Sequence, residues 1–433
     1  MLKLSSNEFY SRHEREIYKY IKKNEKTLYI TANKRISNVT VDGKVDTLVL
    51  DLEKDIVSQL SDLNSYHLVV VTDIFELIDD IYTFLQKISF LIMNDGMLII
   101  STINNIWSPI LKVFEVARLK NNSTPRSYMP IKKLNTISRS AGFEKVNAYT
   151  QQYIPFKIFG VGHLLNSIFE SVFSSLNFGI RTYLLFNKGS EKQHTHLSKS
   201  IIIPAKNEEG NLEPLINRIP DLGKNTEIII SCGKSEDKTV EIANSIKKRN
   251  FQVNVIIQTK NGKANAVWEA LEVCKGDVVA ILDADISVEP EKLKDFFEII
   301  EYGRADFVNG TRLIYSMEKG AMRFLNVLGN RIFQRLISVI IKQPLTDSLC
   351  GTKVFKIEQK TNILDWQNSL KADDPFGDFD LLFSAAYSGK QILELPVHYK
   401  KRVYGKTQIS RFRDGFKLIK YLFLSYIILN KSK

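Results

Sequence analysis

Two carboxylates stand one residue apart, directly after an apolar run in the second half of the chain. Residues 276–282 (GDVVAIL) form that run, and Asp283 and Asp285 follow it. A short bounded apolar run is typical of a buried strand, and open α/β sheets bind ligands at the carboxyl ends of their strands. Paired carboxylates suit Mg²⁺ or Mn²⁺ carrying a diphosphate. The alternative for an isolated Asp-x-Asp is a solvated acidic turn.

The residues around this pair predict the sheet that must position it. Apolar runs at residues 200–203, 227–231 and 253–257 predict three further strands. One helical pattern begins near residue 239, and a second covers residues 263–274. The pair is therefore expected at the end of one strand in an α/β domain.

Seven short motifs in this half occur in the order typical of one family. They are IPAKNEE (203–209), KSEDKT (234–239), NGKANA (261–266), LDAD (282–285), NGTR (309–312), DSLCGTK (347–353) and GDFD (377–380). With these motifs the sequence resembles the family 2 glycosyltransferases of GT-A fold. It is similar to the branch containing dolichyl-phosphate mannose synthase and bacterial polyprenyl-phosphate glycosyltransferases. The resemblance implies an inverting enzyme that moves a sugar from a nucleotide-sugar donor to a lipid-linked acceptor, expected to be polyprenyl phosphate.

The resemblance also implies which residues bind the donor. Asp285, helped by Asp283, would hold Mg²⁺ or Mn²⁺, which acts as a Lewis acid on the diphosphate. Pro204, Asn207 and Glu208 match the family's contacts to the base and the ribose. These three residues stand where the first predicted strand of the domain ends and its loop begins.

Four further residues near the expected donor site leave alternatives open. Asp237 matches the family's turn acid, but it equally suits the cap of the next helix. Lys263 would reach the phosphates or stand solvated in a first helical turn. Cys232 occupies a position where the family usually has an acid, and Ser287 one where the branch often has Gln. The donor base and the third protein ligand of the metal are therefore not predicted.

Cations in the last third of the chain are expected to bind a phosphate on the acceptor. Arg312 matches an arginine of the branch, and Arg402 lies in the basic loop at residues 400–406, which corresponds to the loop that closes over phosphates. Gln408 stands where that loop usually ends in lysine. A phosphate acceptor is already ionised near neutral pH and needs no base.

A hydroxyl acceptor would instead need a general base. Asp378 is the best candidate and Asp380 the second. Both begin a predicted helix, so pairing with the positive end of the helix dipole is the alternative role. A scaffold that binds partners without catalysis is a further interpretation of the chain.

The first half of the chain predicts another sheet. A helix is expected over residues 1–24, and the alternating strands and helical patterns that follow are typical of a parallel, doubly wound sheet. Strands are predicted at residues 28–30, 47–51, 66–73 and 97–101, with a turn at residues 94–96 before the last of them.

This order resembles the class I S-adenosylmethionine-dependent methyltransferases, over about residues 8–187. The resemblance rests on the strand ending at Asp73, the turn and strand after it, and Ala-Gly-Phe at residues 141–143 before a strand. The glycine-rich loop expected after the first strand is absent, because no glycine precedes Gly43. Asp51 would stand at the ribose position or cap its strand. We expect a degenerate domain, kept for packing or partner binding, that does not methylate.

The predicted organisation is two α/β domains joined by a polar linker. The expected parts are a methyltransferase-like Rossmann domain (1–188), a linker (189–198), a GT-A domain (199–410) and a C-terminal basic amphipathic helix (411–433). His194 and His196 lie in the linker, where a metal-binding pair and a solvated pair are the alternatives, and a solvated pair is the better interpretation.

Composition limits the partners. The chain has 433 residues and a net charge of +12, which favours anionic partners such as nucleotide diphosphates or phospholipid surfaces. We find no aromatic and basic motif for nucleic acid, so no nucleic-acid partner is expected. Three widely spaced cysteines predict no disulfide framework and favour a reducing compartment. Oligomeric state is not predicted.

Two basic, apolar segments predict contact with a membrane surface. Residues 321–341 are apolar with arginines at 323, 331 and 335, and residues 421–429 form an apolar run after basic residues. Neither segment supplies a spanning run, so we expect a cytoplasmic protein, peripheral on the inner face of the cytoplasmic membrane. Burial in the core is the alternative.

Overall fold

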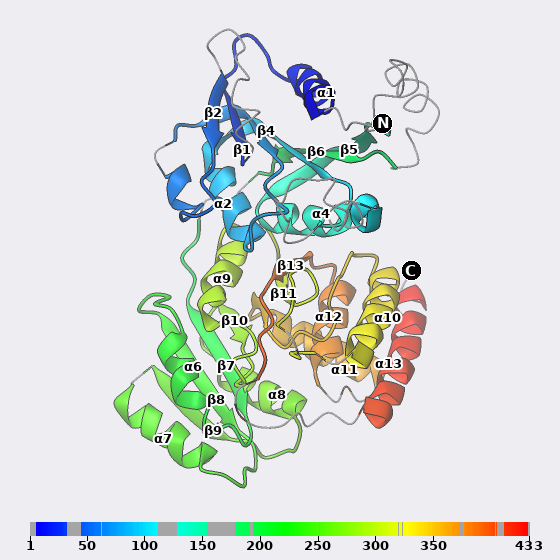
Figure 1. The fold of residues 1–433 in the computed structure, drawn as a ribbon. Coiled ribbons are helices and arrows are strands. Elements are labelled where there is room, and N and C mark those ends of the chain that lie inside the picture. Colours follow the sequence, from blue (N-terminus) through cyan, green and yellow to red (C-terminus); the bar gives the residue numbers. More distant parts are fainter. Residues whose placement is uncertain are drawn as a thin grey trace. The chain divides into compact units, whose positions relative to one another are not determined.

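The protein consists of two compact units, Met1–Ser190 and Glu191–Lys433, each with its own β-sheet (Figure 1). Parallel strands predominate in both sheets, so the fold is mixed α/β. The computed structural model describes residues 6–32, 45–61, 63–110, 128–153, 178–190, 194–250, 252–318, 320–322, 324–372, 374, 376–402, 404 and 411–431.

The described part of the first unit contains a six-stranded sheet in the order β2-β1-β3-β4-β6-β5. Strands β2, β1, β3 and β4 pair in parallel, whereas β6 is antiparallel to both β4 and β5. The strands are β1 (Thr27–Thr31), β2 (Val45–Val49), β3 (Tyr66–Thr72), β4 (Ile92–Ile103), β5 (Phe143–Gln151) and β6 (Arg181–Lys188). The α-helices are α1 (Ser6–Tyr18), α2 (Ile81–Leu91) and α4 (Ile131–Ser140), with 3-10 turns at Ser58–Leu60 and Asn105–Trp107.

Three features of this unit differ from the sequence prediction. The predicted sheet was parallel, whereas β6 runs antiparallel to both of its neighbours. Helix α1 ends at Tyr18 rather than near residue 24. Strand β4 begins at Ile92 and continues through residues 94–96, where a turn was predicted. Its register with β3 shifts between the Tyr66 and Leu68 pairs, so the extra residues form an irregularity within the strand rather than a turn before it.

The second unit contains a seven-stranded sheet in the order β13-β11-β12-β10-β7-β8-β9. Only β12 runs antiparallel to its neighbours among these strands. The amino end of β12 therefore lies at the same edge as the carboxyl ends of the other strands. The strands are β7 (Lys199–Ala205), β8 (Thr226–Cys232), β9 (Val253–Ile257), β10 (Val278–Ile281), β11 (Phe307–Thr311), β12 (Lys353–Lys356) and β13 (Ile392–Pro396).

Helices cover this second sheet and enclose an aromatic core. They are α6 (Leu212–Arg218), α7 (Thr239–Arg249), α8 (Lys263–Val273), α9 (Leu293–Glu301), α10 (Phe324–Ile341), α11 (Gln359–Leu370), α12 (Asp378–Tyr387) and α13 (Arg411–Lys431), with a 3-10 turn at Pro290–Lys292. Trp366 of α11 stacks on Phe383 of α12 with ring centroids 5.6 Å apart. The Trp366 indole also donates a 2.6 Å hydrogen bond to the Tyr421 hydroxyl of α13.

The C-terminal helix α13 is part of this core on one side and exposed on the other. Leu418, Tyr421 and Leu422 are buried, whereas Phe416 and Phe423 are 73% and 64% exposed. The core burial that the sequence left as the alternative therefore applies to one face of this helix, and the other face is exposed. Among the described residues, no helix is both long enough and apolar enough to cross a bilayer.

Candidate functional site

Sheet topology brings the predicted site residues to one edge of the second unit. The loops after β7, β10 and β11 carry Glu208, Asp285 and Arg312. The amino end of antiparallel β12 adds Lys353, and the chain after β13 adds Arg402. This clustering follows from the strand directions, because carboxyl ends of parallel strands share an edge.

Asp283 is paired with a lysine from the first turn of α8. Lys263 Nζ lies 2.5 Å from Asp283 Oδ1, and the two side chains are 29% and 31% exposed. Burial acts to raise the pKa of Asp283, but the positive charges of Lys263, Lys353 and Arg312 outweigh it and lower that pKa. A Cβ at Gly351 would collide with the Asp283 carboxylate and with Lys263 Nζ, so only glycine fits this approach.

Asp285 is held by a guanidinium from the chain after β13. Arg402 Nη2 donates to Asp285 Oδ2 at 2.6 Å, and Arg402 Nη1 lies 3.5 Å from Glu208 Oε1. The backbone N–H of Ser287 donates to Asp285 Oδ1 at 3.0 Å. Burial raises the pKa of Glu208 and outweighs the hydrogen bond from Asn211 and the charge of Arg402, which both lower it.

The guanidinium group of Arg312 makes a two-point contact with one carboxylate, that of Asp347. Its Nε and Nη2 donate to the two oxygens of Asp347 at 2.7 and 2.9 Å. Asp347 is fully buried and also accepts from Asn330 Nδ2 at 2.6 Å. Burial would raise the pKa of Asp347, but Arg312 lowers it to about 2. The Arg312 guanidinium lies over the Tyr399 ring, 5.0 Å from its centroid.

Asp378 faces the same cluster but is paired with a buried lysine. Lys353 Nζ lies 2.5 Å from Asp378 Oδ1, and the Lys353 side chain is fully buried. Lys353 also donates to the backbone carbonyl of Cys350. The candidate base therefore has one oxygen engaged by an ammonium group.

Asp380 points away from the cluster into the helical core. Its Oδ1 accepts from the Tyr421 hydroxyl at 2.5 Å, and its Oδ2 accepts from Gln367 Nε2 at 2.8 Å. Asp374 accepts the backbone N–H groups of Phe379 and Asp380 at 2.7 and 3.0 Å, which caps the start of α12. The two carboxylates also line a pocket of about 940 Å³ with residues of α8 and α11. Asp380 therefore anchors α13 and α11 rather than joining Asp378.

The loops after β7 and β8 are tied to each other. Asn207 has a positive φ of 56°, and its backbone N–H and side-chain oxygen bond to Ser235 and the N–H of Glu236. Asp237 accepts from the N–H groups of Glu209 and Thr239 at 3.2 and 3.0 Å. It therefore bonds the first residue of α7, although the N-cap position itself is Lys238.

Two other predicted positions lie at the ends of these strands. Pro204 lies in β7 opposite Ser231 of β8. Cys232 ends β8, is fully buried, and has a pKa raised to about 11 by that burial. The thiol is therefore an uncharged apolar group where the family usually has an acid.

The residues at this edge fit a hard divalent cation. Asp283 and Asp285 supply carboxylate oxygens, the ligands that Mg²⁺ and Mn²⁺ prefer. In the structure each of these carboxylates already attracts a protein cation, Lys263 on one and Arg402 on the other. The site therefore favours positive charge at both oxygen pairs.

Other predicted basic residues contribute less to this edge. Lys400 pairs with Glu289 at 2.7 Å, and Arg331 is exposed on α10. Arg323, Lys406 and Gln408 lie outside the described residues. Sequence analysis missed Asp347, which pairs with the predicted cation Arg312, and Lys353, which pairs with the candidate base Asp378. Both lie in the DSLCGTK motif.

The carboxyl edge of the first sheet carries a buried polar network. His13 of α1 is hydrogen-bonded to the hydroxyls of Tyr29, Thr72 and Tyr183 at 2.9 to 3.2 Å. Fully buried Arg181 donates to both oxygens of Asp73 at 2.9 and 3.1 Å. Burial and the charge of Arg181 keep the pKa of His13 well below its usual value, so the imidazole is neutral.

Asp51, the candidate ribose ligand of the first unit, is exposed after β2. It accepts from the N–H of Glu53 at 3.1 Å, and its own N–H donates to Gln59. It therefore stabilises a local turn, the capping alternative. Most of the loop after β1, residues 33–44, lies outside the described residues.

Comparison with known proteins gives one family for the second unit. The family model described as Glycosyl transferase family 2 matches residues 200–358. Dolichol-phosphate mannosyltransferase of Pyrococcus furiosus is 36% identical, and the match covers 51% of this chain and 64% of the relative. Glycosyltransferase AglJ of Haloferax volcanii is 30% identical, with 50% and 67% covered.

A more distant curated relative is matched over about half its length. Low-salt glycan biosynthesis hexosyltransferase Agl6 of Haloferax volcanii is 25% identical, and the match covers 52% of this chain and 53% of the relative. Among solved structures, glucosyl-3-phosphoglycerate synthase from Mycobacterium tuberculosis is 19% identical over 53% of this chain and 80% of that chain, with a TM-score of 0.41.

Proposed function

The chain belongs to glycosyl transferase family 2 through its second unit, and we propose that it transfers a sugar from a nucleotide-sugar donor to a phosphate-bearing lipid acceptor. Two relatives support this choice of acceptor, because they are dolichol-phosphate mannosyltransferases. The observation that carries the proposal is the pair Asp283 and Asp285, surrounded by four cations at one sheet edge. Those cations are Lys263, Arg312, Lys353 and Arg402.

Asp283 and Asp285 would hold Mg²⁺ or Mn²⁺, which neutralises the diphosphate leaving group when it is bound. Lys263 and Arg402 now pair with these same two carboxylates. When the metal is bound, it would compete with Lys263 and Arg402 for the carboxylate oxygens of Asp283 and Asp285. Lys263 and Arg402 would then turn to the phosphate oxygens of the donor. The same side chains would therefore pair with the two carboxylates and, when the donor is bound, with its phosphates.

The donor base would lie between the loops after β7 and β8. Asn207 and Glu208 belong to the first loop, and the hydrogen bonds from Asn207 to Ser235 and Glu236 fix its conformation. The buried Cys232 offers no charged acceptor for the base. We therefore propose that base recognition relies on the loops rather than on an acid at the end of β8.

A phosphate acceptor fits the surroundings of Asp378 better than a hydroxyl acceptor. A general base must have an oxygen available to the incoming proton. Asp378 Oδ1 is engaged by the buried Lys353, and the nearby Arg312 and Arg402 add positive charge. Cations of this kind bind a phosphate monoester, which needs no base to attack.

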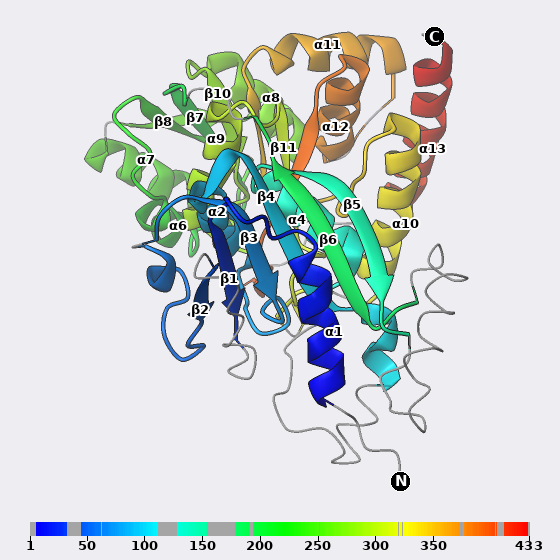
Figure 2. The same ribbon diagram turned by 90° about the horizontal axis from the view of Figure 1, so that it is seen from above.

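We also propose that helices α10 and α13 rest on an anionic membrane surface. They lie side by side in both views (Figures 1 and 2). Each exposes large apolar side chains at helical spacing, far more than scattered surface residues would. On α10 these are Leu325, Leu328, Ile332, Leu336 and Val339, and on α13 Phe416, Ile419, Phe423 and Tyr426. Arg331, Arg335, Lys417 and Lys420 are also exposed on these helices.

For the first unit we propose a methyltransferase-like sheet that has lost its cofactor. The strand order, with β6 antiparallel beside β4, supports the likeness. The buried network of His13 with Tyr29 and Thr72 supports the loss, because these side chains hydrogen-bond one another at the edge where a cofactor would bind. Titration of the whole protein with S-adenosylmethionine should show no heat; micromolar binding would contradict the proposal.

Donor binding can be tested by thermal unfolding against a panel of nucleotide-sugars with Mn²⁺. One class should raise the melting temperature, because a ligand at a hundred times its dissociation constant adds about 2.7 kcal/mol of stability. Asp285→Asn should abolish that rise. Asp365→Asn, an exposed carboxylate of α11, is the matched control and should keep it. If no nucleotide-sugar stabilises the protein with Mn²⁺, the non-catalytic scaffold stands instead.

A further inference from the structure

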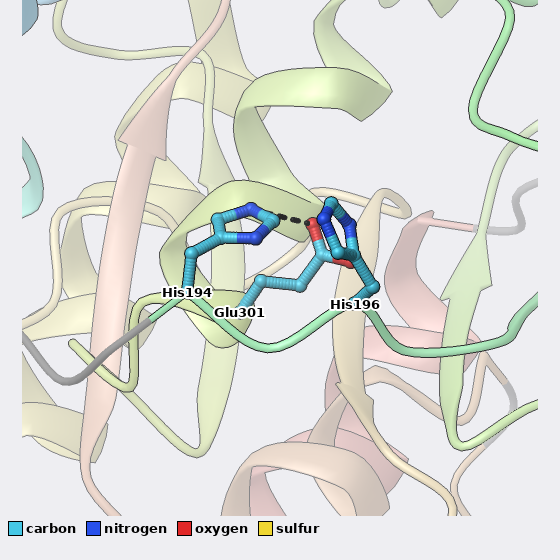
Figure 3. Close-up of side chains that lie close together, drawn as sticks. All are labelled: His194, His196 and Glu301. Atoms are coloured by element: carbon cyan, nitrogen blue, oxygen red, sulfur yellow. Dashed lines mark ion pairs between the residues drawn. The ribbon is translucent and has the colours of Figure 1, made fainter.

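Two histidines and a glutamate gather where the second unit begins, outside the proposed sugar-transfer site. His194 and His196 precede β7, and Glu301 is the last residue of α9. Figure 3 shows both rings beside the Glu301 carboxylate. His194 Nε2 lies 3.6 Å from Glu301 Oε2, and one ligand atom from each residue falls within 4.8 Å of the others.

The types of these three ligands select a class of metal. Imidazole nitrogens bind Zn²⁺, Cu²⁺ and Ni²⁺ well, whereas Mg²⁺ prefers oxygen ligands. Two histidines and one carboxylate form a three-ligand set that zinc accepts with a water as the fourth ligand. The donor chemistry thus differs from that of the two aspartates Asp283 and Asp285.

The electrostatics of the α9 terminus favour a cation at this point. A carboxylate at the C-terminal end of a helix faces the negative end of the helix dipole, which is unfavourable. Lys199 compensates on one side, with its Nζ 2.7 Å from Glu301 Oε1. The N–H of Leu197 donates to the same oxygen at 3.2 Å. The other oxygen, Oε2, faces His194.

The positions of the two imidazole rings and the Glu301 carboxylate allow all three groups to coordinate one ion. In a tetrahedral zinc site with bonds of about 2.0–2.1 Å, neighbouring ligand atoms are roughly 3.3 Å apart. The His194–Glu301 distance of 3.6 Å is already close to that value. His196 is exposed, so its side chain can rotate to bring its ring nitrogen within bonding distance of the ion. The edge of Tyr302 packs on the His194 ring, with centroids 4.8 Å apart, and restricts its orientation.

We propose that His194, His196 and Glu301 bind a transition-metal ion of the zinc class and thereby fix the segment before β7 to the end of α9. A backbone hydrogen bond already joins this segment to the end of α9, because the N–H of Thr195 donates to the Glu301 carbonyl at 3.2 Å. The ion would add three bonds to a segment that hydrogen bonds already join to Glu301 and Asp277, through Thr195, Leu197 and Ser198. The ion would connect the two segments, and its ligands lie outside the proposed sugar-transfer site.

The test is calorimetric titration of the full chain with Zn²⁺ in excess Mg²⁺, which occupies the carboxylate site. The wild type should bind one equivalent of zinc and melt at a higher temperature with it. The variant His194→Ala/His196→Ala should lose the bound zinc equivalent. Zinc should also no longer raise its melting temperature above its own metal-free value. His67→Asn, a histidine of the first unit, is the matched control and should keep both.

Two outcomes would overturn the proposal. One is that the wild type binds no zinc. The other is that the double histidine variant still binds one zinc ion per chain. Asp285→Asn separates this site from the sugar-transfer site, because it should keep zinc binding while losing nucleotide-sugar binding. Failure of the sugar-transfer proposal would therefore leave this result unchanged.

Discussion

At the residue scale, the proposed donor site holds its carboxylates and cations in pairs. Lys263 pairs with Asp283, and Arg402 pairs with Asp285 and Glu208. Each pair reduces the cost of clustering like charges at one sheet edge. Each pair also has to separate when metal and donor bind.

Replacing Arg402 should therefore have opposite effects on metal and donor. In Arg402→Ala, Asp285 and Glu208 lose their guanidinium, so Mn²⁺ alone should bind about tenfold more tightly, a gain of about 1.4 kcal/mol. The nucleotide-sugar should bind more weakly in the presence of Mn²⁺, because a phosphate partner is gone. Calorimetry with and without donor measures both. Arg218→Ala, which breaks an exposed pair with Glu291, is the control and should change neither.

Replacing Asp378 should distinguish the two acceptor chemistries. With a phosphate acceptor, Asp378→Asn should keep the turnover per folded molecule within about tenfold of wild type, because no base is needed. The melting temperature should fall, since the buried Lys353 loses its partner, a change that typically costs about 3–5 kcal/mol. Steady-state kinetics and a melting curve on the same sample separate the effects. A loss of turnover far beyond tenfold would instead support a hydroxyl acceptor.

The sequence motifs predicted which residues gather but not how they pair. Asp283, Asp285 and Arg402 were identified by type and order, and the sheet edge brings them together. The partners of Arg312 and Asp378 are 35 and 25 residues away along the chain, in Asp347 and Lys353. Such pairs depend on the antiparallel course of β12, which no local periodicity reveals.

At the scale of elements, buried carboxylates fix helices α11, α12 and α13 to one another. Asp374 caps α12, while Asp380 bonds to Gln367 of α11 and Tyr421 of α13. Burial raises the pKa of Asp374 to about 7, and the charges of Asp380 and Asp378 add to the effect. Burial of Asp374 therefore links the stability of this helix start to pH.

This aspartate gives the stability a definite pH dependence. The pKa of Asp374 is higher in the folded protein than the usual 3.9, so between about pH 4 and 7 only the folded state holds this proton. The free energy of unfolding should fall as pH rises through that window, by at most about 1.4 kcal/mol per pH unit for this group. Asp374→Asn should flatten that fall in urea unfolding measured from pH 4 to 8. An unchanged slope would contradict the assignment.

Another buried acid provides an internal reference for this measurement. Burial raises the pKa of Glu394 to about 7 as well, so part of the slope should remain in the Asp374 variant. Asp347, whose pKa is lowered to about 2, makes the free energy of unfolding rise with pH rather than fall. Its stabilisation is complete above pH 4 and is lost as pH falls from about 4 toward 2.

Periodicity predicted most strands of both sheets, but it misplaced the boundary between helix α2 and strand β4. The apolar runs before Asp283 and before Pro204 are central strands, as expected. The Asn-Asp-Gly at residues 94–96 was predicted as a turn because its residue types favour one. Pairing of β4 with β3 and β6 overrides that preference, which is a tertiary effect that composition cannot show.

At the scale of the whole molecule, α10 and α13 each leave an apolar face exposed. Their residues are exposed in rows, with Val339 and Phe416 both 73% exposed. The net charge of +12 has the sign that an anionic surface attracts. Sequence analysis predicted these segments but could not separate their buried faces from their exposed ones.

Vesicle sedimentation should test this surface. The protein should sediment with vesicles containing phosphatidylglycerol, less with pure phosphatidylcholine, and less as NaCl rises, because screening weakens charge attraction. Val339→Glu/Phe423→Glu should reduce the bound fraction about tenfold or more, since two charges would enter the interface. Val146→Glu, on an exposed strand position of the first unit, should bind like wild type. Equal binding by the double variant would exclude these two faces as the contact.

The most direct test of the account is sugar transfer itself, from a labelled nucleotide-sugar to polyprenyl phosphate with Mn²⁺ present. We expect labelled glycolipid from the wild type and from the Asp365→Asn control. Asp285→Asn should reduce its formation by at least a hundredfold, a loss of about 2.7 kcal/mol of transition-state stabilisation. Equal glycolipid formation by Asp285→Asn would contradict the assignment of Asp283 and Asp285 as the centre of the site.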